Sequence, residues 1–311
     1  MKNATRKITY AAMIAALYAA LTLILMVILI SAGMSPFDAI LQSFATAGTG
    51  GFSNHNTSIA AFESVPIEII LAFGMLIFAV NFNLYFYALR GRWREALKSD
   101  ELHWFVGIVL IAVTAITITI MPMYDSFWLC LKDAFFNVAT IVTTTGFGTA
   151  DFCQWPLFAQ MVLLMLMFIG GCAGSTAGGL KISRVIALAK MAGKKLRQSV
   201  NPKRVSVIIY EDKPMNERSQ NDIALYFILY IILFFLMVVL VSFQNLDFTT
   251  TFTAVVTTFN NVGPGLGNVG PTGNFSNFSD FSKCVLSFSM IAGRLEIVPL
   301  ILLFAPSTWR A

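Results

Sequence analysis

The stretch that decides the fold is residues 133–147, Asp-Ala-Phe-Phe-Asn-Val-Ala-Thr-Ile-Val-Thr-Thr-Thr-Gly-Phe. Residues 38–52 align with it, because both stretches begin with Asp-Ala and end with Gly-Phe, and the aspartate precedes the glycine by 13 residues in each. A weaker third copy begins at Thr250 and ends in Asn-Val-Gly-Pro-Gly at residues 261–265. Gly51, Gly146 and Gly263 are therefore 95 and then 117 residues apart. Internal repetition dominates the organisation of the chain.

The repeats lie between apolar runs. The chain is 57% hydrophobic and 12% charged, far from the roughly 25% charged residues of soluble domains. Six runs approach or exceed the length needed to cross a bilayer, about 20 helical residues: residues 8–32, 66–89, 104–121, 154–173, 223–243 and 284–305. The first run is too long for a cleaved signal peptide, so we expect a membrane helix there.

The basic residues, which give a net charge of +5, are concentrated in blocks between these runs. One block precedes the first run, one follows the second, and one separates the fourth from the fifth. The positive-inside rule places all of them in the cytoplasm, together with the N-terminus. The basic excess thus indicates orientation and not nucleic-acid binding. The blocks include Lys2, Arg6, Lys7, Arg90, Arg92, Arg94, Lys98, Lys190, Lys194, Lys195, Arg197, Arg204 and, at the end of the chain, Arg310.

Enzymatic chemistry and cofactors have little support in the sequence. The four cysteines lack CxxC spacing and only two histidines are present, so no transition-metal motif can be assembled. We find no pair of residues typical of covalent or acid–base catalysis, and we expect no cofactor and no enzyme. A transporter with inverted repeats is also disfavoured, because the basic blocks give every repeat the same orientation.

Each repeat predicts a short helix that enters the membrane without crossing it. Residues 35–38, Ser-Pro-Phe-Asp, offer an N-cap, a first-turn proline and a first-turn acid. The helix would run about ten residues and reach about halfway through the hydrocarbon. Irregular backbone at that depth must be buried in protein or line a watery path. We therefore expect a pore-lining loop after each short helix.

The composition of these loops suits a potassium filter. Backbone carbonyls can replace the water shell of K⁺ without a full charge that would hold the ion too tightly. Glycine permits the positive φ angles that turn successive carbonyls toward one axis, and threonine adds hydroxyl oxygens. The alternative is that the loops are ordinary turns between helices. The predicted K⁺-binding residues are Thr49, Gly50, Gly51, Thr144, Thr145, Gly146, Asn261, Val262 and Gly263.

Two further motifs accompany these three segments: the ten small residues 170–179 (Gly-Gly-Cys-Ala-Gly-Ser-Thr-Ala-Gly-Gly) and residues 293–296 (Gly-Arg-Leu-Glu). On these motifs, the whole chain resembles the TrkH, KtrB and HKT superfamily of potassium transporters, most of all its bacterial TrkH branch. The resemblance implies an all-α polytopic membrane protein, like a K⁺ channel folded into one chain. Its units are a membrane helix, a pore helix with a filter loop, and a second membrane helix. We assign them to residues 1–98, 99–204 and 205–311 as the family's second, third and fourth units.

The family pattern has four units, and this chain matches three. We expect the missing one to be the N-terminal first unit. A ring lacking a quarter would leave the coordination cage incomplete, so a truncated, non-conducting product is one alternative. A Na⁺/K⁺ transporter of the same superfamily is another, because the absent unit carries a filter position that bears on Na⁺ preference. Otherwise we expect potassium uptake.

The resemblance also implies a gate. Residues 170–179 would form an intramembrane loop below the filter, with Arg294 as its counterpart and a positive barrier. Packing of small residues between helices is the alternative for the loop, and an arginine snorkelling to the interface is the alternative for Arg294. A phosphate-binding loop is excluded, because the Gly-Lys-Ser/Thr ending is lacking. The predicted gating residues are Gly170, Gly171, Gly174, Ser175, Thr176, Gly178, Gly179 and Arg294.

Partners follow from the resemblance as well. They are K⁺, the lipid bilayer of the cytoplasmic (inner) membrane, a second copy of the chain in a homodimer, and a cytoplasmic nucleotide-binding regulatory subunit like TrkA or KtrA. Coupling to H⁺ or Na⁺ in symport stays open. Asn81 and Asn83, which interrupt the second apolar run, are interpreted as packing residues.

Overall fold

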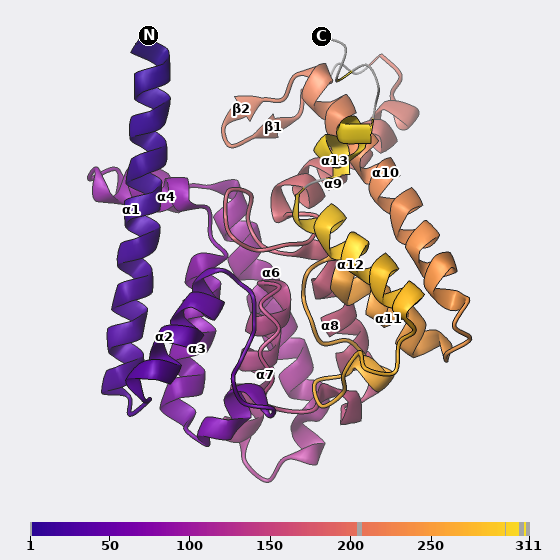
Figure 1. Ribbon diagram of the computed structural model, residues 1–311. Coiled ribbons are helices and arrows are strands. Elements are labelled where there is room, and N and C mark those ends of the chain that lie inside the picture. The colour runs from indigo at the N-terminus through magenta and orange to yellow at the C-terminus, as the bar shows by residue number, and fades with distance from the viewer. Residues whose placement is uncertain (1, 204–206, 296, 305–307, 309–311) are drawn as a thin grey trace.

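The computed structural model describes residues 2–203, 207–295, 297–304 and 308, with the side chains of residues 2–7, 10 and 304 left aside. Among the residues named above, Arg204, Glu296 and Arg310 therefore lie outside the described part. The molecule is a bundle of helices, and the start of the first helix and the last helix lie toward the same end of it (Figure 1). The predicted helical membrane fold is confirmed, with one small addition. Residues in the basic connection form a two-stranded hairpin, β1 (Ile209–Tyr210) and β2 (Lys213–Pro214).

The helices are grouped by the three predicted units, called unit 1 (residues 1–98), unit 2 (residues 99–204) and unit 3 (residues 205–311). Unit 1 contains α1 (Lys2–Ser31), the pore helix α2 (Pro36–Ala47), α3 (Val65–Phe78) and α4 (Phe82–Leu89). Unit 2 contains α6 (Asp100–Ile120), the pore helix α7 (Phe127–Val142), α8 (Leu157–Ile169) and α9 (Ile182–Val200). Unit 3 contains α10 (Glu217–Ser242), the pore helix α11 (Phe248–Phe259), α12 (Asp280–Arg294) and α13 (Ile297–Phe304). Short helix α5 (Trp93–Leu97) links units 1 and 2, and the 3₁₀ turns Ser58–Phe62, Met121–Met123, Phe152–Gln154 and Gly267–Val269 lie in the loops.

The second membrane helix of every unit is broken, and two of the three breaks lie where the sequence analysis places interruptions, at Asn81 and at residues 170–179. In the described residues, three helices are long and apolar enough to span a membrane, or up to five if each bent pair counts as one. The run 66–89 is split into α3 and α4, which meet at 89°, and the run 284–305 is split into α12 and α13, which meet at 114°. In unit 2 the ten-residue small-residue segment separates α8 from α9. Hydropathy did not reveal the bends within runs 66–89 and 284–305, because apolar residues flank both, whereas the break at residues 170–179 is visible as a run of small residues.

The first pore helix begins where the sequence places its start signal, and α11 has a similar cap, whereas α7 begins at Phe127 without a side-chain cap. The Ser35 hydroxyl accepts a hydrogen bond from the Asp38 backbone N–H, and Pro36 occupies the first turn. At α11, the Asp247 carboxylate accepts from the Thr250 N–H at 2.9 Å. Each cap satisfies a backbone donor that the helix leaves open, which stabilises the start of the helix by about 1 kcal/mol.

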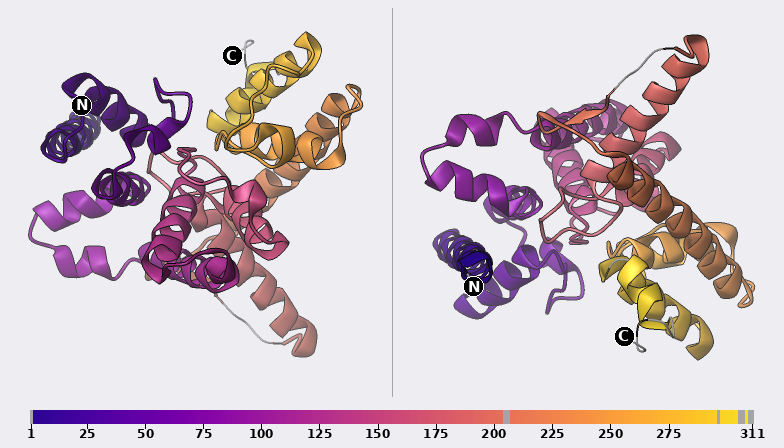
Figure 2. Two further views of the ribbon diagram at one scale, coloured as in Figure 1. Left: turned by 90° about the horizontal axis from the view of Figure 1, so that it is seen from below. Right: turned by 90° about the horizontal axis from the view of Figure 1, so that it is seen from above.

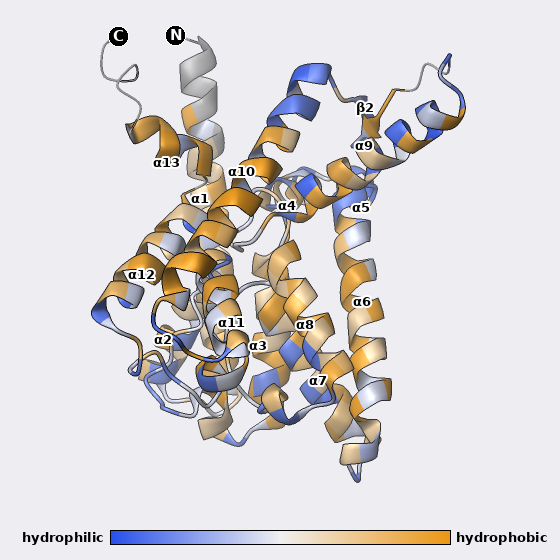
Figure 3. Ribbon diagram, turned by 90° about the vertical axis from the view of Figure 1, so that its right-hand side faces the viewer, coloured by the Kyte–Doolittle hydropathy of each residue, from blue (hydrophilic) through white to orange (hydrophobic). Residues whose placement is uncertain are grey.

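The apolar interior forms two clusters. One packs α1, α2 and α3 against Phe136, Ala139 and Phe147 of unit 2. The other fills the space among α6, α7, α8, α10, α11 and α12. Apolar residues also cover the outer faces of the helices, while hydrophilic residues gather at the two ends of the bundle (Figure 3). This distribution is that of a protein surrounded by lipid.

An ion cluster joins units 1 and 2 at their predicted outer ends. The Lys132 ammonium lies 2.6 Å from the Glu68 carboxylate and 3.0 Å from that of Asp133. All three side chains are largely buried, and Lys132 is only 14% exposed. Removing one member of such a cluster leaves uncompensated buried charge, which costs about 3–5 kcal/mol.

We therefore expect Lys132→Met to lower the free energy of unfolding by about 3–5 kcal/mol, because Glu68 and Asp133 would repel each other without the ammonium. Thermal or denaturant unfolding of the purified protein in detergent measures the change. Lys283→Met is the matched control, since Lys283 is exposed and bonds the Ser276 carbonyl at 3.3 Å. Equal midpoints for the two variants would contradict the role of the cluster.

Candidate functional site

The C-terminal ends of the three pore helices meet the three predicted filter segments. Helices α2, α7 and α11 end with the cap residues Gly48, Thr143 and Asn260, one residue before each segment. None of the three has a basic residue in its last turn. The end of a helix carries about half a negative charge from its unpaired carbonyls. The arrangement therefore favours a cation next to all three segments.

The backbone repeats the same unusual conformation in each segment. The first residue has positive φ, with values of 47° at Thr49, 55° at Thr144 and 56° at Asn261. The third residue also has positive φ, with 64° at Gly51, 88° at Gly146 and 109° at Gly263. Non-glycine residues adopt this region at a cost of about 1–2 kcal/mol. Its occurrence in three copies shows that the surrounding fold imposes it.

Glycine is required where neighbouring segments touch. A Cβ atom on Gly51 would overlap the Thr145 carbonyl oxygen, and one on Gly146 would overlap the Val262 carbonyl oxygen. The first segment therefore packs on the second, and the second on the third. Gly263 differs, because the nearest atom to its Cβ position is the Gly146 Cα at 3.9 Å. The nine predicted filter residues are thus brought together as three sides of one axis.

On the fourth side of this axis a cavity of about 580 Å³ opens, lined by residues of all three segments and by α12. From below, units 1 and 3 flank this side and unit 2 lies opposite (Figure 2). The phenylalanines that follow the first and second segments differ in exposure, because only one of them borders the cavity. Phe147 is 1% exposed between units 1 and 2, whereas Phe52, its counterpart in the first copy, is 78% exposed and lines the cavity. The described chain therefore encloses the axis on three sides.

Residues 170–179, called the gate loop below, lie against the inner end of the filter. The Thr49 hydroxyl donates to the Thr176 carbonyl at 2.8 Å, and the Gly178 N–H donates to the Thr144 hydroxyl at 2.5 Å. A Cβ on Gly178 would overlap the Asn260 carbonyl. The loop thus contacts one residue at or just before the start of each of the three segments.

The small residues predicted for gating allow the loop to fold on itself. A Cβ on Gly170 would overlap the Gly178 carbonyl, and one on Gly179 would lie 2.8 Å from the Gly170 Cα. The Ser175 hydroxyl donates to the Cys172 carbonyl at 2.6 Å. Gly171 and Gly174 pack on the break between α3 and α4. Close backbone approach explains the residue types, in addition to any need for flexibility.

The break between α3 and α4 binds the gate loop through backbone hydrogen bonds. The Cys172 N–H donates to the Ala79 carbonyl at 2.9 Å, and the Phe82 N–H donates to the Gly174 carbonyl at 3.2 Å. Asn81, interpreted from sequence as a packing residue, caps α4 by accepting from the Asn83 N–H. Its side chain lies 3.0 Å from where a Cβ on Gly174 would be. The broken helix therefore offers free backbone groups that a continuous helix would have paired internally.

Arg294 lies beside the filter and bonds a different group from the one expected. Its guanidinium Nη2 donates to the Gly48 carbonyl at 3.0 Å, at the end of α2, and the resemblance had placed it against the gate loop. A Cβ on its neighbour Gly293 would overlap the Phe259 carbonyl. Glycine thus lets α12 cross the end of α11 closely enough for Arg294 to reach across the open side.

Several residues at this site escaped the sequence analysis. Glu101 accepts from the Ala173 N–H of the gate loop at 2.6 Å, and Tyr230 donates to the buried Asn260 amide oxygen at 2.7 Å. Glu101 lay outside the predicted run 104–121, yet an acid in the first turn of a helix was a usable signal. Asn260 and Gly293 were quoted within motifs but gained a role only through contacts with distant segments.

Acids line the predicted outer end. Hydrogen bonds from the Asn54 and Ser35 side chains hold the pKa of the Asp38 carboxyl below its usual value. The Thr250 backbone N–H likewise lowers the pKa of Asp247. A lowered pKa keeps a carboxylate charged to more acidic pH, so both remain anions and attract cations to this end.

Comparisons with known proteins agree with this geometry. A family model described as TrkH, cation transport protein, matches residues 2–310. The Trk system potassium uptake protein TrkH of Salmonella typhimurium is 38% identical over 94% of this chain, and TrkG of Escherichia coli is 32% identical over 90%. The crystal structure of the potassium transporter TrkH from Vibrio parahaemolyticus aligns over 98% of this chain with a TM-score of 0.92 and 35% identity.

The matched relatives are longer than this chain. The alignment covers 61% of the Salmonella protein, 58% of TrkG and 66% of the Vibrio structure. The chain therefore spans about three fifths of the length of the curated relatives it matches.

The packing of the gate loop generates a stability prediction. Gly178→Ala should destabilise the protein by about 1–3 kcal/mol, because the added methyl must displace the Asn260 carbonyl or the loop. Gly193→Ala is the matched control, since nothing lies within 4 Å of its Cβ position in α9 and alanine is the better helix former. Unfolding midpoints of both variants in detergent provide the measurement. A Gly178→Ala midpoint at or above that of the control would show that the loop does not press on the filter.

Proposed function

We propose, from the premise that this chain belongs to the TrkH family of cation transport proteins, that it builds the greater part of a pore that carries potassium into the cell. The family and the named relatives are transporters, and the chain is a multi-pass membrane protein. The observation that carries the proposal is the filter itself. Three segments repeat one backbone conformation at the negatively polarised ends of three helices.

The proposed selectivity rests on backbone carbonyls. Positive φ at the first and third residues of a segment allows successive carbonyl oxygens to turn toward one side, and such dipoles can replace the water of K⁺. Transport would be passive through the filter and would follow the membrane potential. We assign the ion-binding role to the nine filter residues, and the gating role to the gate loop and Arg294.

We further propose the inner membrane as the location, with the N-terminus in the cytoplasm. The basic segments around α5 and α9 lie at the end of the bundle where α1 begins, which agrees with the positive-inside rule (Figure 3). The three pore units of residues 1–98, 99–204 and 205–311 stand as proposed domains. A homodimer and a cytoplasmic nucleotide-binding regulatory subunit are proposed from the family resemblance, and the regulator would find exposed basic side chains on that face.

The open fourth side of the filter axis supports a second candidate, a chain that does not conduct ions by itself. The cavity on the fourth side and the exposed Phe52 leave the filter axis open in the described chain. An ion there would lack oxygens on one side, so the chain by itself could be a non-conducting product. The two candidates differ in what a further pore unit would do.

Growth of a potassium-uptake-deficient bacterium on low K⁺ separates them. We expect rescue when the chain is expressed behind a preceding pore unit taken from a full-length TrkH relative, because that unit would occupy the open side. Rescue by the chain alone would exclude the non-conducting candidate. If neither version rescues growth although both insert into the membrane, the transport proposal is wrong.

Filter chemistry is tested by Gly146→Ser in the conducting version. We expect the preference for K⁺ over Na⁺ to fall about tenfold, a loss of about 1.4 kcal/mol, because the side chain would push the Val262 carbonyl from the axis. Gly148→Ser is the matched control, since its Cβ position meets other atoms only at 3.8 Å or more. Ion ratios are measured by isotope flux or conductance. Unchanged ratios in Gly146→Ser would remove Gly146 from the filter.

A further inference from the structure

A buried carboxylate holds the gate loop from the cytoplasmic side. Glu101, in the first turn of α6, is 3% exposed. It accepts a 2.6 Å hydrogen bond from the Ala173 N–H. The loop is thereby anchored at Ala173, a point that its contacts with Thr49 and Thr144 do not reach.

Glu101 is in turn fixed by the hairpin between α9 and α10. The Glu211 carboxylate, in the hairpin turn, accepts from the Ser99 hydroxyl at 2.8 Å and from the Glu101 backbone N–H at 3.1 Å. Glu211 and Asp212 both have positive φ, so the turn is tightly constrained. Lys190 of α9 ties the same region together, because its ammonium bonds the Asp100 carboxylate and the Ile209 carbonyl, each at 2.9 Å.

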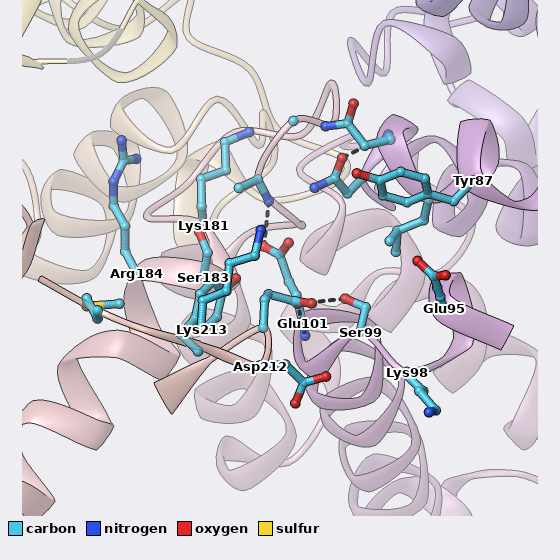
Figure 4. Close-up of a pocket in the computed structure, with 18 of the residues that line it drawn as sticks. Tyr87, Glu95, Lys98, Ser99, Glu101, Lys181, Ser183, Arg184, Asp212 and Lys213 are labelled. Carbon is cyan, nitrogen blue, oxygen red and sulfur yellow. Dashed lines mark hydrogen bonds between the residues drawn. The ribbon is translucent and has the colours of Figure 1, made fainter. Parts of the chain in front are cut away.

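A cavity of about 980 Å³ adjoins this chain of contacts (Figure 4). Glu101, Ala173, Gly174 and Glu211 line it, together with Lys181. The gate loop thus has space on the side from which Glu101 holds it. If the Glu101 contact were lost, the Ala173–Gly174 part of the loop would have room to move on this side.

We propose that Glu101 is a positioning residue that holds the gate loop against the filter, and that Glu211 of the hairpin fixes Glu101 in place. The inference deepens the proposed function, since it rests on the loop being the gate. A displacement of the hairpin turn would reach Ala173 through two residues. A cytoplasmic event at the hairpin is thereby connected to the inner end of the filter, without a change at the filter itself.

Cys172, inside the gate loop, provides a native probe. It is 0% exposed, and it can be made the sole thiol by replacing Cys130, Cys153 and Cys284 with alanine. The rate at which a maleimide or methanethiosulfonate reagent labels Cys172 is then measured in inverted membrane vesicles that contain the chain. We expect Glu101→Ala to raise this rate at least tenfold. Glu101→Gln should raise it less, because the amide oxygen still accepts from the Ala173 N–H.

Glu95→Ala is the matched control. Glu95 lines the same cavity but pairs with the exposed Arg92, at 2.6 Å, and its loss should leave the labelling rate unchanged. A rate for Glu101→Ala equal to that of Glu95→Ala would overturn the proposal. A parallel protein whose sole cysteine is the buried Cys130 controls for unfolding. If Glu101→Ala exposes Cys130 as strongly as Cys172, Glu101 supports the fold in general and the positioning role is wrong.

The contact between the hairpin and Glu101 is tested with a separate variant of Glu211. Glu211→Ala should raise the labelling rate of Cys172 on its own and should add little in the Glu101→Ala background, because the two residues act in series. Multiplying effects would show that Glu211 acts on the loop independently, which contradicts the series. Labelling requires no ion transport. If Glu101→Ala speeds labelling but the chain carries no potassium, the proposed function is wrong and the positioning role stands. If the chain carries potassium but Glu101→Ala leaves labelling unchanged, the positioning role is wrong and the proposed function stands.

Discussion

The contact between backbone segments at one axis constrains the rest of this structure. Gly51 lies against the Thr145 carbonyl and Gly146 against the Val262 carbonyl, at separations that no Cβ atom could occupy. Protein interiors are close-packed, so such contacts need rigid support on their outer sides. The pore helices supply it, since each ends one residue before its segment. The conformation of Thr49, Thr144 and Asn261, which is costly for residues with a side chain, is maintained by this packing.

The inner half of the molecule follows from the same constraint. A loop can reach the filter only if a helix stops to admit it, and α8 stops at Ile169 for this purpose. The break after α3 exposes the Ala79 carbonyl and the Phe82 N–H, which then bind the loop. Glycines at 170, 178 and 179 let two backbone strands of the loop cross. Filter, gate loop and broken helices are thus one packed assembly, so a movement at any part has a short path to the others.

Acidic and basic side chains are separated along the axis on which the three segments pack. Acids whose pKa values are lowered by hydrogen bonds, Asp38 and Asp247, lie at the outer starts of pore helices whose inner ends are negatively polarised. Most basic side chains occupy the opposite end of the bundle (Figure 3). Arg294 is different, because it lies beside the filter segments and its guanidinium bonds the Gly48 carbonyl. The Arg294 guanidinium therefore places a positive charge beside the cavity and next to the negatively polarised end of α2.

The sequence by itself determined the membrane class, the three repeats and the start of α2, because hydropathy, caps and glycine spacing are local properties. The small-residue gate loop was also visible as a break in an apolar run. Only the tertiary structure decided that α3 and α12 end early, that Arg294 contacts Gly48, and that Glu101, Asn81 and Asn260 belong to the site. These features depend on contacts between residues dozens to hundreds of positions apart, such as Arg294 with Gly48 and Glu101 with Ala173. A local pattern carries no record of which distant backbone group will lie within hydrogen-bonding distance.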